Sequence, residues 1–266
     1  TEYWEGSLKR DNPNLGEVTS FMVQPMAAFG LTDRINLIAG LPWVKNEASA
    51  GTLKSEKGLQ DFSFAAKIRP FSCEIGPGKL DLMATLGVSA PVRNYTADYL
   101  PLCVGLHSKT ASARAIFQYW LKMGLTIGAQ AGYTSRSNVT IDRSFYYIND
   151  TPYYTNDVEM PNVVDYSATV GFLNKSLKIN LNYVIMDTRS DSDIRRNDMP
   201  FISNNMDASR ITGVVQYYLP RKIGLSFLAM GGYTLSGRNV GQATSIGGGL
   251  AYQFGAYKKA KVESSK

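Results

Sequence analysis

The sequence holds few residues that could carry out catalysis. Its only histidine, His107, is followed directly by Ser108. A serine nucleophile needs a base within hydrogen-bonding reach, and adjacent residues of a strand point to opposite faces. The His-x-Ser spacing that some membrane-embedded hydrolases use is not met, because the serine comes one position early. We therefore expect that the protein is not an enzyme.

Metal and redox chemistry have equally little support. Cys73 and Cys103 lie in no CxxC or Cys/His spacing, so a structural zinc site is not expected. Asp191 and Asp193 could approach a cation, but their loop lacks the glycine and the distal glutamate of an EF-hand. A solvated charged loop is the favoured interpretation, and we expect neither a metal nor another cofactor.

The other residues that could interact with a solute or partner are charged residues scattered along the chain. The chain has 28 Lys and Arg against 22 Asp and Glu, a net charge of +6, and clusters its basic residues only near the C-terminal end. This distribution does not predict a nucleic-acid partner. Eight charged residues fall on positions that the strand pattern described next turns inward: Asp61, Lys67, Arg69, Asp81, Arg114, Asp165, Lys178 and Arg210.

The elements that would position these charges are strands. From Lys79 to Val92, and again from Met123 to Thr134, apolar residues alternate with polar or small ones. Side chains alternate between the two faces of a strand, so each segment predicts a strand with one apolar and one polar face. No stretch approaches the roughly 18 consecutive apolar residues of a membrane-spanning helix. The mean hydropathy of −0.17 hides the alternation.

The same pattern recurs along the whole chain. It predicts twelve strands near residues 2–9, 17–29, 34–44, 58–70, 79–92, 107–120, 123–135, 162–173, 177–188, 206–219, 223–236 and 242–254. The connections alternate between tight turns, such as 30–33 and 174–176, and long loops, such as 93–106 and 136–161. Bacterial outer-membrane barrels have short periplasmic turns and longer extracellular loops.

We therefore predict an all-β fold: a transmembrane antiparallel β-barrel of about 12 strands, of the bacterial outer-membrane type. One domain would cover residues 1–254, with a basic tail at 255–266, and both termini would lie on the periplasmic side. The chain starts at Thr1 without an apolar leader, as is expected after removal of a targeting peptide.

Aromatic residues are consistent with this orientation, because their rings favour the two membrane interfaces. One predicted girdle, at the short-turn end, contains Phe29, Phe71, Tyr119, Trp120, Phe172, Tyr217, Tyr252 and Phe254. The other contains Trp43, Tyr133, Tyr183 and Tyr233. Ordinary β-propensity of aromatic residues is the alternative explanation.

Two interpretations of the interior remain open. A twelve-stranded barrel has a backbone diameter of roughly 24 Å, so the inward charges could line an aqueous path for small solutes. They could instead pair across the lumen and close it. The loop 136–161 carries Tyr146, Tyr147, Tyr153 and Tyr154, which could gate the mouth or hold a ligand, or could simply pack against neighbouring loops.

Four segments resemble a known family: Gly30–Val44, Gly58–Phe71, Leu82–Val92 and the closing GGGLAYQF. They are similar to the outer-membrane transporters associated with the meta-cleavage pathway of phenol degradation, which typically show a Gly-Leu-Thr-Asp-Arg turn, a strand ending in Leu-Pro, and a Gly-Leu-x-Asp strand running into Ala-Lys-x-Arg. Where the family usually continues with Pro-Thr-Gly, this chain has Pro91, Val92 and Arg93. The resemblance implies a barrel that passes small hydrophobic compounds, and it supplies no catalytic residue.

The expected function is therefore a channel or facilitator for small, hydrophobic or amphiphilic molecules. The alternative is a non-conducting structural barrel subunit of a larger outer-membrane complex. Expected partners are outer-membrane lipid, a small-molecule solute and, for the alternative, other outer-membrane proteins. Inward bases outnumber inward acids, which predicts a preference for anions.

Overall fold

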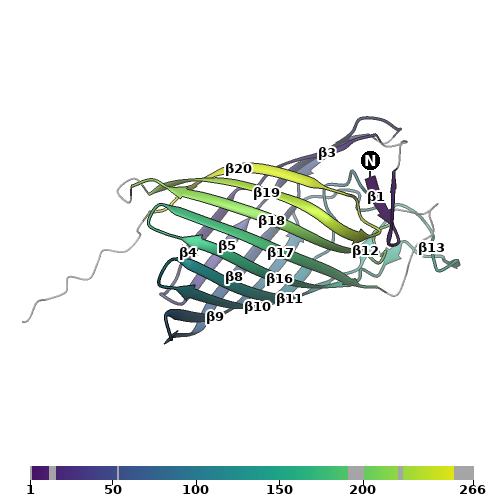
Figure 1. Ribbon diagram of the computed structural model, residues 1–266. Coiled ribbons are helices and arrows are strands. Elements are labelled where there is room, and N and C mark those ends of the chain that lie inside the picture. Colours follow the sequence, from purple (N-terminus) through teal and green to yellow (C-terminus); the bar gives the residue numbers. More distant parts are fainter. Residues whose placement is uncertain (1, 12–15, 53, 191–200, 221–223, 255–266) are drawn as a thin grey trace, which may run out of the picture.

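The computed structural model describes residues 2–11, 16–52, 54–190, 201–220 and 224–254. Long tilted strands form the wall of a barrel (Figure 1). One antiparallel sheet holds eleven strands in the order β20-β19-β18-β17-β16-β11-β10-β9-β8-β5-β4. Their bounds are β4 Met26–Gly30, β5 Ile35–Gly40, β8 Asp61–Ile75, β9 Gly78–Pro91, β10 Thr110–Leu121, β11 Leu125–Arg136, β16 Asn162–Leu173, β17 Leu177–Arg189, β18 Asp207–Tyr218, β19 Leu225–Arg238 and β20 Thr244–Tyr252.

A smaller sheet extends this wall toward the long loops. It contains β3 (Val18–Val23), β6 (Trp43–Ala48) and β7 (Glu56–Leu59), in the order β3-β6-β7. Along the chain, each of these strands continues a strand of the large sheet: β3 precedes β4, β6 follows β5, and β7 precedes β8. Two of the three breaks contain a proline, Pro25 or Pro42, which has no N–H to donate to a ladder. If each such pair of consecutive strands is counted as one, the described wall has eleven strand-length segments.

The predicted first strand, residues 2–9, is wrong. These residues belong to a separate hairpin of β1 (Glu2–Glu5) and β2 (Leu8–Asp11), which turns at Gly6 with a φ of 55°. Trp4 anchors it: the residue is 6% exposed, and its backbone N–H donates to the carbonyl of Val240 at 2.8 Å. Alternation over so short a range cannot distinguish one strand from two shorter ones.

The two ends of the described chain lie at opposite rims. The β1–β2 hairpin sits beside the connection 239–242, at the rim that carries the long loops (Figure 1). Strand β20 ends at the other rim, where the N–H of Gln253 donates to Gly224. The prediction that both termini share one side is therefore wrong for the described residues. The tail 255–266 lies outside them, so its separation from the barrel stays a prediction.

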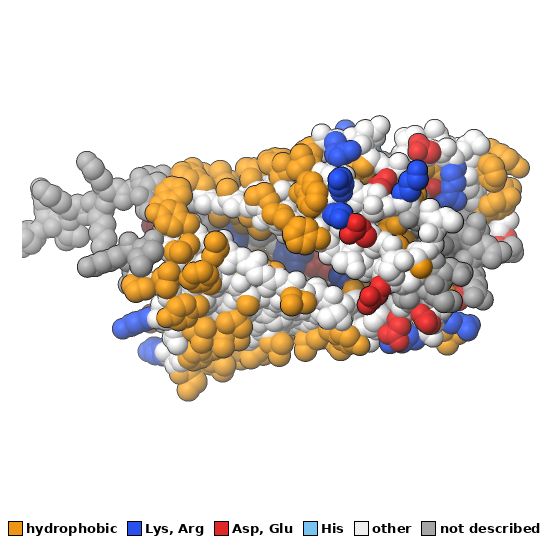
Figure 2. All heavy atoms as spheres, turned by 90° about the horizontal axis from the view of Figure 1, so that it is seen from above, with side chains coloured by type: hydrophobic (Ala, Val, Ile, Leu, Met, Phe, Trp, Pro, Cys, Tyr) orange, Lys and Arg blue, Asp and Glu red, His pale blue; other side chains and the backbone are white. Residues whose placement is uncertain are grey.

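The outer face of the wall is apolar. Outward side chains such as Leu86, Val170 and Leu181 are 55%, 55% and 52% exposed. In the space-filling view, apolar side chains cover much of the barrel, and charged ones gather at the long-loop end (Figure 2). Among the described residues no helix is long and apolar enough to cross a membrane.

Most of the predicted aromatic girdle at the short-turn rim faces outward, including Phe71 and Tyr217, which are 48% and 51% exposed. Trp120 does not: its Nε1 donates to the carboxylate of Asp81 at 3.0 Å, so the ring belongs to the inner face. At the other rim Tyr133, Tyr183 and Tyr233 are exposed, each by 44–47%. The antiparallel all-β architecture is confirmed.

Two further two-stranded sheets lie in the longest loop. Strand β12 (Val139–Thr140) pairs with β15 (Asp157–Val158), and β13 (Tyr146–Ile148) pairs with β14 (Thr151–Tyr153). A β-bulge at Arg69 and Pro70 shifts the register between β8 and β9. Because the wall encloses a lumen, the largest buried hydrophobic cluster forms in the loops rather than in the centre of the barrel.

Candidate functional site

The best-defined interaction of the lumen wall is an ion pair between Arg114 and Asp165. The guanidinium of Arg114, on β10, contacts both carboxylate oxygens of Asp165, on β16, at 2.8 and 2.9 Å. Strand β11 lies between them, and the residue there in register with both is Gly132. A Cβ at this glycine would come within 2.6 Å of the carboxylate. The absent side chain at Gly132 thus lets the pair form across β11.

Three basic residues of the lumen lack such a partner. Among the described residues, no hydrogen bond or ion pair engages the side chains of Lys67, Lys178 or Arg210. Lys67 and Lys178 lie five strands apart in the sheet order, yet their charges are close enough to repel each other. They therefore approach each other across the lumen.

Asp81 is the most buried of the predicted lumen acids, at 5% exposure. It accepts hydrogen bonds from Ser72 at 2.6 Å and from Trp120 at 3.0 Å. Lys79 lies 3.9 Å away. These contacts fix the carboxylate against the wall near the short-turn rim.

Arg69 and Asp61 lie at opposite ends of β8. Arg69 is part of the β-bulge, and its guanidinium donates to the backbone carbonyl of Asp33 in the turn between β4 and β5, at 2.9 Å. Asp61 lies near the long-loop rim and accepts a hydrogen bond from the hydroxyl of Tyr95 at 2.5 Å. The contact of Arg69 stabilises the turn between β4 and β5, and the contact of Asp61 stabilises the loop that contains Tyr95.

That loop, residues 92–109, is fastened over the rim by further polar contacts. The amide of Asn46 donates to the carbonyl of Cys103 at 2.7 Å, and Gln60 donates to Val104 at 2.9 Å. Burial raises the pKa of Cys103 to about 12, and burial together with Asp61 raises the pKa of Tyr95. Both side chains therefore stay protonated at neutral pH.

The structure also accounts for His107 and Ser108. The ring of His107 packs edge-on against Tyr95, with ring centroids 4.9 Å apart. The Ser108 hydroxyl donates to the carbonyl of Ser137 at 2.6 Å. Both residues therefore make contacts that hold the loops at the long-loop rim in place.

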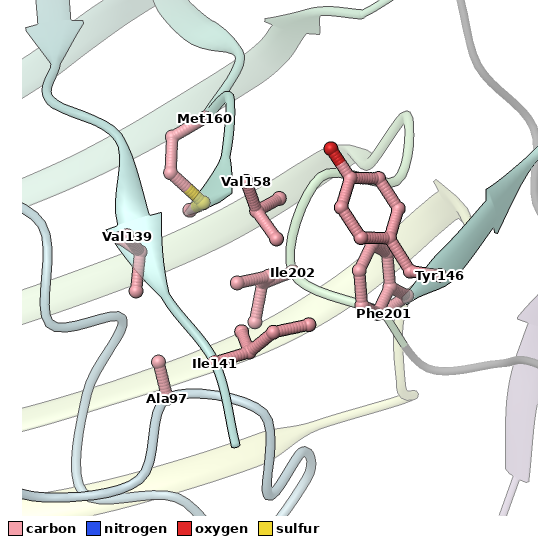
Figure 3. Close-up of a cluster of buried hydrophobic side chains, with 8 residues drawn as sticks. All are labelled: Ala97, Val139, Ile141, Tyr146, Val158, Met160, Phe201 and Ile202. Atoms are coloured by element: carbon pink, nitrogen blue, oxygen red, sulfur yellow. The ribbon is translucent and has the colours of Figure 1, made fainter. Parts of the chain in front are cut away.

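A buried hydrophobic cluster lies among the loops at the long-loop rim. We call it the loop cap: eight buried residues from three connections between wall strands (Figure 3). They are Ala97, Val139, Ile141, Tyr146, Val158, Met160, Phe201 and Ile202. Val158 is fully buried, and Phe201 and Ile202 are each 2% exposed. The three loops therefore pack as one unit.

The four tyrosines of the longest loop separate into two groups. Tyr146 is buried in the loop cap, where its ring packs against Phe201 with centroids 5.4 Å apart. Burial raises the pKa of its hydroxyl. Tyr153 stacks on Tyr146 from outside, whereas Tyr147 and Tyr154 are 44% and 84% exposed. Of the four, only Tyr146 is part of the loop cap.

The lumen wall also has a recess of about 420 Å³. We call it the wall recess. Its lining includes the predicted residues Arg114, Asp165 and Arg210, together with Val163, Val184 and Met186 and several polar side chains. The sequence pattern placed the charged residues on the inner face, but it could not bring them together, because that depends on the register between strands.

The fold and this lining define a class of protein: a β-barrel of the kind that forms bacterial outer-membrane channels. It is shared by solved structures, among them the following two. The "COG4313 outer membrane channel from Pseudomonas putida F1" superposes with a TM-score of 0.69 at 14% identity, over 92% of this chain and 86% of that chain. The "NanC porin" superposes with a TM-score of 0.52 at 10% identity, over 89% and 96% of the two chains.

The chain belongs to the family described as "Putative MetA-pathway of phenol degradation", whose model matches residues 27–246. The resemblance seen in the sequence is thereby confirmed. No curated protein sequence matches the chain. The two solved structures are described as an outer membrane channel and a porin, and they confirm the predicted barrel fold.

Proposed function

We propose that the protein is a channel in the bacterial outer membrane that passes small, hydrophobic or amphiphilic molecules, with its short turns facing the periplasm. The observation that carries the proposal is the combination of an apolar outer face with a lumen wall that carries unpaired cations. A barrel that served only as a scaffold would be expected to pair its interior charges with one another. The family and the two channel structures support the same conclusion.

The lumen charges support a preference for anions. Asp165 is neutralised by Arg114, and Asp81 is held against the wall by Ser72, Trp120 and Lys79, whereas the side chains of Lys67, Lys178 and Arg210 make no hydrogen bond or ion pair with the described residues. Cations inside low-dielectric walls concentrate anions, and salt screens the effect.

Planar-bilayer recording tests both statements. We expect discrete conductance steps, with a reversal potential in a KCl gradient that indicates chloride selectivity and declines as ionic strength rises. The double variant Lys67→Gln/Lys178→Gln should reduce the selectivity. Lys122→Gln, in the turn between β10 and β11, removes one charge at the rim and should leave it nearly unchanged. Cation selectivity of the unaltered protein would contradict the proposal.

The alternative, a non-conducting structural subunit, is favoured by one observation. The loop cap packs three loops at the long-loop rim into one unit with fully buried side chains such as Val158, and a packed unit at that rim favours a closed mouth. Electrical silence together with partner proteins that co-purify in stable amounts would favour this second function.

A further inference from the structure

The wall recess combines one free cation with an apolar surface. Arg210, on β18, has no hydrogen bond or ion pair among the described residues, although it lines the recess. Arg114 lines the same recess but is already neutralised by the two carboxylate oxygens of Asp165. The net charge offered to a solute there therefore comes from Arg210.

The strand register shows how these groups are arranged. One row around the wall runs from Arg114 through Gly132 and Asp165 to Met186, each in register with the next. The adjacent inward row, two residues along the strands, runs from Gln130 through Ser167 and Val184 to Arg210. Val184 and Met186 therefore lie between the ion pair and the free guanidinium.

This arrangement suits one kind of solute. A guanidinium binds a carboxylate through two parallel hydrogen bonds, and the bond is strongest where little water competes. Beside it, Val184 and Met186 offer apolar contact to a compact hydrocarbon or aromatic body, and Asn182 and Thr212 offer polar groups at the edge. The volume of about 420 Å³ lies in the range of small-molecule sites.

We propose that the wall recess is a binding site for a small amphiphilic carboxylate, with the carboxylate on Arg210 and the apolar body against Val184 and Met186. The proposal rests on the proposed channel function and names the class of solute that the channel would select.

Benzoate and its neutral isostere benzamide probe the site directly. Binding to the full chain in detergent micelles is measured by isothermal titration calorimetry or by ligand-observed NMR. We expect benzoate to bind more tightly than benzamide. Arg210→Gln should weaken benzoate binding by roughly 10- to 100-fold and leave benzamide unchanged, because only the charged hydrogen bonds are lost. Arg210→Lys should retain part of the affinity.

Two further variants make the test specific. Arg34→Gln applies the same change in the turn at the short-turn rim and should leave benzoate binding unaltered. Asp165→Asn removes the partner of Arg114 and thus adds a second free cation, so benzoate should bind more tightly. Heat-modifiable gel migration confirms that each variant is folded. Equal binding of benzoate and benzamide, or unchanged benzoate binding in Arg210→Gln, would overturn the site.

The recordings separate this proposal from the channel function. A conducting protein that binds no benzoate would retain the channel and eliminate the recess as a carboxylate site. A silent protein that binds benzoate through Arg210 would retain the site and eliminate the channel. Benzoate that both binds through Arg210 and reduces chloride conductance in the unaltered protein, but not in Arg210→Gln, would support both.

Discussion

A single glycine determines whether the main ion pair of the lumen can form. Replacement of Gly132 by alanine would place a Cβ 2.6 Å from the Asp165 carboxylate. The carboxylate would have to move, which weakens a bidentate pair and leaves a half-buried charge less well compensated. We expect the free energy of unfolding to fall by about 1–3 kcal/mol, measured by urea titration in micelles.

The matched control is Gly213→Ala. A Cβ at Gly213, on β18, meets no atom within 4 Å, so this substitution should have little effect on stability. Equal losses for the two variants would show that glycine in these strands matters for a reason other than the ion pair.

A second prediction at the scale of single residues concerns the reactivity of the Cys103 thiol. Both cysteines are free thiols, and Cys103 is 8% exposed. With a pKa of about 12, only about one thiol in 10,000 is ionised at pH 8, and the thiolate is the reactive form. In a Cys73→Ser variant we therefore expect no labelling by a thiol reagent at pH 8 until the protein is unfolded. Labelling of the folded variant within minutes would show that the loop over Cys103 opens readily.

At the scale of elements, the loop cap is the part most open to test. Phe201→Ala should remove packing against Tyr146 and create a cavity among the three loops, a loss of about 3–5 kcal/mol in a well-packed core. We expect longer or more frequent open events in bilayer recordings. Phe145→Ala, in the same part of the barrel but 43% exposed, is the control and should behave like the unaltered protein. Unchanged gating in Phe201→Ala would mean that the loop cap does not obstruct the path.

The wall strands could be predicted closely, whereas the loops could not. The range 79–92 corresponds to β9 at Gly78–Pro91, and 162–173 corresponds to β16 at Asn162–Leu173. Period-two alternation is strong there because one face meets lipid and the other does not. The loop cap has no comparable sequence pattern. Phe201 and Val158 lie in different loops, and they meet only because the barrel brings the ends of distant strands together.

For the candidate site, the sequence predicted which face of the wall each residue lies on, but not which residues meet. Alternation placed Arg114, Asp165 and Arg210 on the inner face, but pairing depends on the register of three or four strands. Arg69 illustrates the difficulty, since the bulge at Arg69 and Pro70 takes its guanidinium to the carbonyl of Asp33. The loop containing Asp191 and Asp193 falls within residues 191–200, outside the described residues.

At the scale of the whole molecule, the apolar outer face dictates behaviour in solution. Side chains such as Phe71, Ile127 and Val215, which are 42–48% exposed, would meet water in the absence of lipid. We expect the protein to need detergent, to show β-rich circular dichroism in micelles, and to migrate differently on a gel before and after heating. A monodisperse monomer without detergent would contradict the membrane assignment.

The odd number of strand segments in the described part of the wall has a consequence for assembly. In the described residues β4 and β20 end the sheet order, and no pairing joins β20 to β3 or β4. Both edges run from the long-loop rim to the short-turn rim, and interior charges are visible through the wall in Figure 2. Bonds across this line would be parallel, slanted and weaker per residue than those of the other, antiparallel neighbours. We therefore expect this junction to be the last part of the wall to close when the barrel folds, and the first to separate when it unfolds.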